Sequence, residues 1–140
     1  MIGILIISHG NLGDSLIHCA NHVMGKQPPQ LQSLTVATND DPNSLLPHAQ
    51  QLVKALNTGD GVLVLSDMYG ATPCNMVAKL LTSGKVEGVA GVNLPMLLRV
   101  LNYRDVSIDV CVEKAIRGGR EGVVHFTELG CEHHHDSTLT

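Results

Sequence analysis

A histidine and an aspartate each follow an apolar run in this chain of 140 residues. His9 closes the run 2–8, and Asp67 follows the run 62–65 after a single serine. A neutral imidazole is a good nucleophile near pH 7 and can carry a phosphoryl group or a metal. A carboxylate that accepts from one ring nitrogen leaves the other nitrogen free to attack and stabilises the developing positive charge. The purely structural alternatives are a histidine that only ends a strand and an aspartate that accepts backbone N–H groups in its own loop.

Small residues follow both His9 and Asp67 in the sequence. Gly10 follows His9 and leaves the backbone open to an incoming group. Gly70, Ala71 and Thr72 precede Pro73, which is a favoured first residue of a helix. Backbone N–H groups and a hydroxyl at a positive helix end suit a phosphate, so we expect a phosphate cradle there. A plain helix cap needs the same residue types.

The remaining histidines and the cysteines carry weaker signals. His18 and His22 stand four residues apart and could bind a metal, but a solvated helix face is the simpler interpretation. His48 is expected at the surface, and His125 in a strand near the end of the chain. The run 133–135 could bind nickel or zinc adventitiously, and the scattered cysteines are assigned to packing. We therefore expect no metal site and no cofactor.

The elements that must position His9 and Asp67 alternate along the chain. Strands are expected at 2–8, 31–37, 62–65, 86–92 and 123–126. Helices are expected from a cap at Asp14 or Ser15 to about 24, at 44–56, at 73–82, at 95–101, and from a cap at Ser107 to about 116. This alternation predicts an α/β fold with a mainly parallel sheet of four strands flanked by helices. Parallel strands with right-handed crossovers end at one rim, where ligands bind, so His9 and Asp67 are expected on that rim.

Composition narrows the class of protein. Aromatic residues make up 2% of the chain and the formal net charge is -4, which argues against binding to nucleic acid. The apolar start of the chain lacks the basic flank of a signal peptide, and no apolar run is long enough to span a membrane. We expect a cytoplasmic protein with one domain, 1–128, and a polar tail, 129–140, that is disordered.

Four segments together resemble the mannose-family enzyme IIA of the bacterial phosphoenolpyruvate-dependent sugar phosphotransferase system. They are Ile6–Gly10, Ser66–Asn75, Val89–Leu97 and Gly119–Val123, and the resemblance runs from Met1 to about Phe126. It implies that His9 carries the phosphoryl group on Nε2, that Asp67 orients its ring, and that Thr72 supplies a hydroxyl near the phosphoryl group. The donor implied is phospho-HPr and the acceptor is an EIIB subunit, with the membrane reached only through the permease complex.

The resemblance also implies a homodimer in which a fifth, antiparallel strand, Val123–Phe126, crosses to the sheet of the partner. Asn11 and Leu12 stand where relatives have bulkier or aromatic residues, and Met68–Tyr69 replaces a commoner Thr-Trp-like pair. Both departures bear on partner choice. No IIB domain follows in this sequence, so the resemblance is to a stand-alone IIA.

Other functions share parts of this pattern. A regulatory phosphoacceptor needs the same fold and the same His9. A sirohydrochlorin-type chelatase also ends its first strand in a His-Gly pair, but it needs a second histidine where this chain has Asp67. A histidine phosphatase has arginine where Ser8 stands, and the phosphotransfer subunit of dihydroxyacetone kinase has a small polar residue in place of Gly10.

Overall fold

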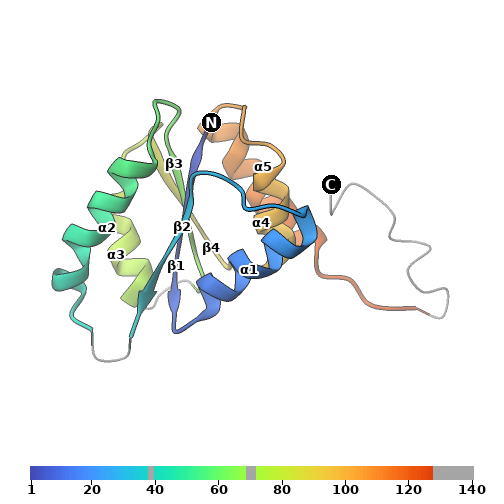
Figure 1. The fold of residues 1–140 in the computed structure, drawn as a ribbon, viewed down its shortest axis with the longest axis horizontal. Helices are drawn as coiled ribbons and strands as arrows, with labels where there is room; N and C mark the ends of the chain where they lie inside the picture. Colours follow the sequence, from blue (N-terminus) through green and yellow to red (C-terminus); the bar gives the residue numbers. More distant parts are fainter. Residues whose placement is uncertain (38–39, 69–71, 128–140) are drawn as a thin grey trace.

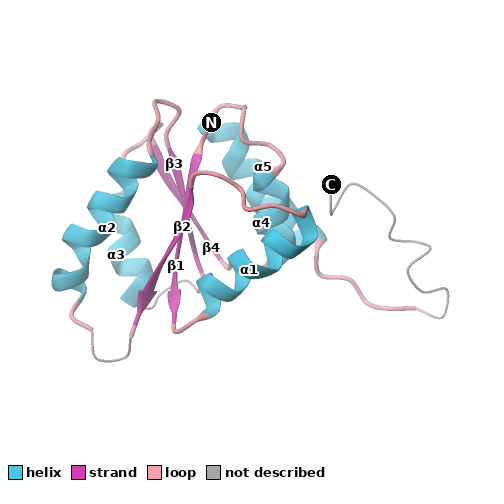
Figure 2. Cartoon of the chain, viewed as in Figure 1, coloured by secondary structure: helices cyan, strands magenta, loops and turns pink. Residues whose placement is uncertain are grey.

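The computed structural model describes residues 1–37, 40–68 and 72–127 and has an α/β architecture (Figure 1). Its centre is a sheet of four parallel strands in the order β2-β1-β3-β4 (Figure 2). The strands are β1 (Gly3–His9), β2 (Leu31–Val36), β3 (Val62–Ser66) and β4 (Val86–Ala90). The prediction of a parallel, four-stranded sheet flanked by helices is confirmed.

Helices cover both faces of the sheet. On one face lie α1 (Leu12–Met24), α4 (Leu94–Leu101) and α5 (Ile108–Glu121), and on the other lie α2 (Pro42–Leu56) and α3 (Thr72–Leu80) (Figure 1). Successive side chains of a strand point to opposite faces. Accordingly Ile4 and Ile6 of β1 join the core under α1, α4 and α5, whereas Leu5 and Ile7 join the core under α2 and α3. This burial on both faces explains why β1 is an almost unbroken apolar run.

The start of α1 differs from the prediction. The helix begins at Leu12 rather than after a cap at Asp14 or Ser15, and Asn11 precedes it without a side-chain capping bond. The hydroxyl of Ser8 accepts from the backbone N–H of Gly13 instead. The cap therefore comes from the preceding strand, which local sequence preference does not reveal.

The end of α5 also corrects the prediction. The glycines at 118 and 119 indicated a loop after residue 116, but the helix continues to Glu121. A Cβ at Gly118 would lie 2.6 Å from the Cβ of Arg99, and one at Gly119 would lie 2.8 Å from Cε of Met96. Glycine is present because α4 and α5 pack closely, and not because the helix ends there.

The fifth strand predicted at Val123–Phe126 is not formed within this single chain. The described residues that follow α5, 122–127, have no strand or helix, and Val123 and Phe126 are 80% and 74% exposed. A strand exists only when it pairs with another, and this segment leaves the sheet rather than lying along it (Figure 1).

Within the described ranges, the structure has no helix with the length and hydropathy needed to cross a membrane. The predicted tail, 129–140, lies outside the described residues.

Candidate functional site

The strand order places the site at the carboxyl ends of β1 and β3. These two strands are neighbours in the middle of the sheet, and the chain leaves them toward opposite edges, to β2 and to β4. Such a reversal opens a crevice at the carboxyl ends of the strands, where ligands bind in parallel α/β sheets. His9 is the last residue of β1, and Asp67 directly follows β3.

The side chains of His9 and Asp67 are in contact. Asp67 Oδ2 lies 2.9 Å from Nδ1 of the His9 ring and 3.0 Å from the backbone nitrogen of His9. Asp67 Oδ1 accepts a third hydrogen bond, from the backbone N–H of Met68 at 3.0 Å. One carboxylate therefore holds both the ring and the main chain of His9.

The surroundings of the two groups differ. The side chain of Asp67 is 10% exposed, whereas that of His9 is 45% exposed. Burial raises the pKa of Asp67, but hydrogen bonds from His9 and its charge lower it, and the net pKa lies below the usual aspartate value. An ionised carboxylate has no proton to donate, so the proton of the contact belongs to Nδ1. When the ring is neutral, Nε2 is then left with its lone pair.

The turn after His9 requires glycine. Gly10 has a φ of +52°, which is in the left-handed region, and its N–H donates to the carbonyl of Val36 at 3.4 Å. Residues with a side chain rarely adopt this backbone conformation. Gly10 therefore allows the chain to leave β1 sharply and enter α1. The turn keeps the His9 ring at the rim rather than in the core.

The predicted phosphate cradle is described only in part. Gly70 and Ala71 lie outside the described residues. The helix α3 begins at Thr72, and since α3 follows β3, its amino end lies at the same rim as His9. Backbone N–H groups at a helix start are unpaired and carry partial positive charge.

The other histidines of the chain that the structure describes lie away from this contact. His18 and His22 are exposed on α1, and His48 is exposed on α2, as predicted. His125 lies in the exposed segment after α5 rather than in a strand. Within the described ranges, no three His, Cys, Asp or Glu side chains form a group that could hold a metal ion.

The packing prediction can be compared with the structure at Cys19 and Cys111, because the side chains of Cys74 and Cys131 lie outside the described part of the chain. Cys111 is buried, and burial raises its thiol pKa to about 11. Cys19 is exposed, so its assignment to packing is wrong. A helix turns one side to water, and position 19 falls on that side of α1.

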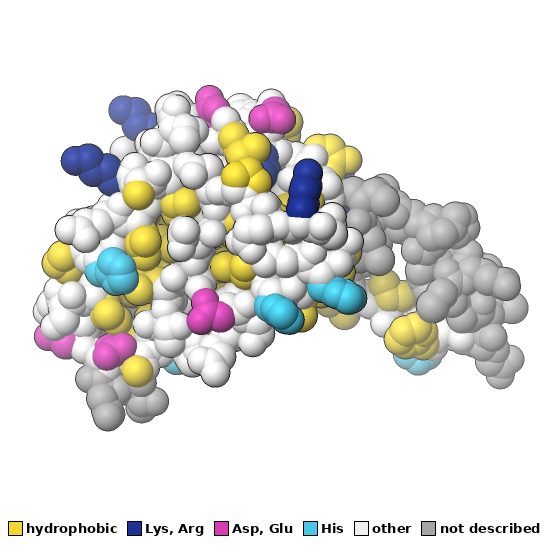
Figure 3. All heavy atoms as spheres, viewed as in Figure 1, with side chains coloured by type: hydrophobic (Ala, Val, Ile, Leu, Met, Phe, Trp, Pro, Cys, Tyr) yellow, Lys and Arg dark blue, Asp and Glu magenta, His cyan; other side chains and the backbone are white. Residues whose placement is uncertain are grey.

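Acidic side chains surround the rim. Asp14 lies in the first turn of α1, and Asp40 and Asp41 lie immediately before α2. The loops that follow β1, β2 and β3 contain no Lys or Arg in their sequences. On the face shown in Figure 3, Lys and Arg side chains lie toward the opposite end of the sheet. The rim around His9 therefore favours a basic partner over an acidic one.

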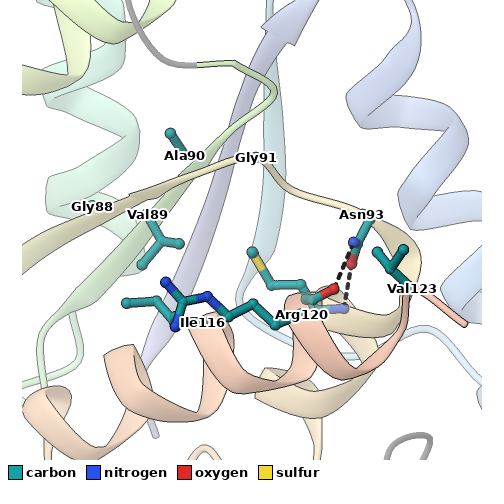
Figure 4. A pocket seen from close by; sticks show the side chains of 10 residues that line it. Gly88, Val89, Ala90, Gly91, Asn93, Ile116, Arg120 and Val123 are labelled. Atoms are coloured by element: carbon teal, nitrogen blue, oxygen red, sulfur yellow. Dashed lines mark hydrogen bonds between the residues drawn. The ribbon is translucent and has the colours of Figure 1, made fainter.

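A groove of about 550 Å³ runs beside β4, away from His9. Gly88, Gly91, Ile116, Arg120 and Val123 are among the residues that line it (Figure 4). Figure 4 shows the Arg120 side chain extending along the groove beside Ile116.

The outer edge of β4 forms one wall of this groove. Among the described residues, β4 pairs with no strand on that side beyond a single bridge between Thr82 and Val86. Val86 exchanges both of its backbone hydrogen bonds with Thr82, and the part of this edge beyond Val86 is available to another strand.

Comparison with known proteins identifies relatives along most of the chain. The family model described as "EIIA-man: PTS system fructose IIA component" matches residues 3–116. The mannose-specific EIIAB component of Escherichia coli (strain K12) is 32% identical over 125 residues, which cover 87% of this chain. This chain spans only 38% of the length of that relative. The fructose-specific EIIA component of Bacillus subtilis is 29% identical over 106 residues, which cover 75% of this chain and 72% of that one.

Solved structures share the fold. The EIIA component of Streptococcus agalactiae superposes with a TM-score of 0.79 at 28% identity, covering 89% of this chain and 97% of that one. The mannose/sorbose-specific IIA subunit of Enterococcus faecalis gives a TM-score of 0.80 at 20% identity, covering 90% and 95% of the two chains.

Proposed function

Because this chain belongs to the EIIA-Man family of phosphotransferase-system components, we propose that it relays a phosphoryl group on His9 during carbohydrate uptake. The donor is phospho-HPr and the acceptor is an EIIB subunit. The observation that supports this most strongly is the contact of 2.9 Å between Asp67 Oδ2 and His9 Nδ1, beside a ring that is 45% exposed.

The transfer is a substitution at phosphorus. The lone pair on His9 Nε2 attacks the phosphoryl group, a new N–P bond forms, and the N–P bond of the donor breaks. The His9 ring gains positive charge as the bond forms, and Asp67 stabilises it through the Nδ1–H hydrogen bond. A second substitution, with an EIIB nucleophile attacking the same phosphorus, returns Nε2 to its free state.

The phosphoryl oxygens need donors. We assign this role to the backbone at Gly10, Gly70 and Ala71 and to Thr72 at the start of α3. The open turn at Gly10 and the amino end of α3 on the same rim support the assignment. The aspartates around the rim favour a donor whose docking face is basic.

We further propose that two copies assemble by exchanging the segment Val123–Phe126 as a fifth, antiparallel strand. The unpaired outer edge of β4, the groove beside it and the exposure of Val123 and Phe126 support this proposal. A second copy would pair the edge and bury the apolar side chains together, and identical chains usually associate with two-fold symmetry.

The proposed site of action is the cytoplasm, with the membrane reached only through the EIIB-containing permease complex. Sugar choice would then rest with the membrane components, because this protein handles only the phosphoryl group.

The test is incubation of the full chain with phosphoenolpyruvate, enzyme I and HPr, followed by mass measurement. One added phosphate is expected, labile in acid and stable in base, as for an N-linked phosphoryl group. His9→Gln should abolish the addition, and His18→Gln, at an exposed position on α1, should not. Unchanged labelling of His9→Gln would refute the assignment.

A further inference from the structure

Ser8 is a buried polar residue next to the proposed phosphorylation site. It is 1% exposed, lies between Ile7 and His9 in β1, and its Oγ accepts from the Gly13 N–H at 2.8 Å. A buried hydroxyl with a good hydrogen bond constrains the backbone on both sides of the bond.

This hydrogen bond replaces a missing cap. The first backbone N–H groups of a helix lack partners within it, and a side chain at the capping position usually supplies one. Asn11 occupies that position in α1 and makes no side-chain capping bond. The hydroxyl of Ser8 reaches across the turn to Gly13, so the loop that contains His9, Gly10 and Asn11 is closed at its base.

Gly13 is what allows this approach. A Cβ at Gly13 would lie 3.0 Å from Ser8 Oγ and 3.1 Å from the Cβ of Ser33. The next residue, Asp14, accepts from the hydroxyl of Ser33 on β2. The first turn of α1 is thus attached to two strands, β1 through Ser8 and β2 through Ser33.

We infer that Ser8 is a positioning residue for phosphoryl transfer. This inference rests on the proposed relay function of His9. Asp67 holds His9 by its backbone nitrogen as well as by its ring, so both contacts depend on where the chain leaves β1. The bond between Ser8 and Gly13 sets that path, and it keeps Nδ1 against Asp67 while Nε2 faces the donor.

Two variants of the full chain each disrupt the hydrogen bond between the Gly13 N–H and Ser8 Oγ, one at the acceptor and one at the donor. Ser8→Ala deletes the acceptor, and Gly13→Ala leaves the hydroxyl but places a methyl group against it. The matched control is Ser107→Ala, because the Ser107 hydroxyl caps α5 by accepting from the Val110 N–H at 3.3 Å, at the opposite end of the sheet. All three variants lose a bond at a helix start, but only the first two touch the turn at His9.

Transfer from phospho-HPr is measured at a temperature where circular dichroism shows every variant folded. We expect kcat to fall by about tenfold in Ser8→Ala and Gly13→Ala, with KM nearly unchanged, since small displacements of a reacting group are costly. Ser107→Ala should lower Tm and leave kcat unchanged. A kcat for both Ser8→Ala and Gly13→Ala within about twofold of the parent would overturn the inference.

A second readout needs no donor protein. Nitrogen NMR of the His9 ring should show the proton on Nδ1 in the parent chain and a mixture of the two tautomers in Ser8→Ala. An unchanged tautomer in folded Ser8→Ala would also overturn the positioning role. If the parent chain accepts no phosphoryl group, the relay function fails, and the tautomer measurement alone then decides the role of Ser8.

Discussion

Ile7 of β1 pairs with Ser66 of β3, and this register brings the residue after β3, Asp67, alongside the last two residues of β1. The contact between Asp67 and His9 is therefore a consequence of strand pairing. A shift of one residue would turn Asp67 to the other face of the sheet.

Asp67→Asn should slow transfer strongly. The substitution keeps the size of the side chain but removes the charge that stabilises the developing imidazolium, and its NH₂ group favours the wrong tautomer. Loss of such a charge at a transition state costs ~2–4 kcal/mol, or roughly one and a half to three powers of ten in rate. The rate of transfer from phospho-HPr measures this, with Asp105→Asn as the exposed control. A rate within about twofold of the parent would show that Asp67 does not contribute to transfer by His9.

The same carboxylate predicts a pH dependence of stability. Burial raises the pKa of Asp67, but its hydrogen bonds with His9 together with the His9 charge outweigh this, so the pKa is lower in the folded chain than its usual value. The stabilisation is complete above the unfolded pKa of about 3.9 and is lost as the pH falls through the folded pKa. The difference in unfolding free energy between the parent and Asp67→Asn should therefore shrink below about pH 4. Urea titrations at pH 6 and pH 3 measure it, and an equal difference at both would contradict the prediction.

The segment Val123–Phe126 should determine the oligomeric state. Replacing Val124 and Phe126 together by aspartate places two charges in the proposed dimer contact, where they would be buried at high cost. Light scattering should then find monomers for the double variant, where we expect a dimer for the parent chain. Val23→Asp is the control, since Val23 is 58% exposed on α1 and far from β4. A stable dimer of the double variant would exclude exchange of this strand.

Gly118→Ala should destabilise the fold although alanine is the better helix former. Alanine gains ~1 kcal/mol over glycine within a helix. The added Cβ would lie 2.6 Å from Cβ of Arg99, so α4 and α5 would have to separate. Overpacking of this kind costs ~1–3 kcal/mol, which leaves a net loss in most of that range. Thermal and urea unfolding measure the effect, and a more stable variant would show that the two helices can move apart freely.

Much of this fold follows from local pattern. Apolar runs of strand length alternate with helical patterns, and turn residues separate them, so the α/β class and the parallel sheet could be predicted. Three helices begin after residue types that are preferred at the N-cap, namely Asp41, Asn93 and Ser107. His9 and Asp67 could be expected at one rim because parallel strands joined by crossovers all end there.

Tertiary structure decided what depends on residues distant along the chain. The order β2-β1-β3-β4 and the pairing of Ile7 with Ser66 brought His9 within 2.9 Å of Asp67, where spacing alone allowed only a common rim. The bond from Gly13 to Ser8 replaced a cap that local preference placed at Asp14 or Ser15. The glycines of α5 indicated a loop in sequence, but contact with Arg99 and Met96 makes them part of a helix. Close packing between elements can override local propensity because it buries more surface than a single turn can.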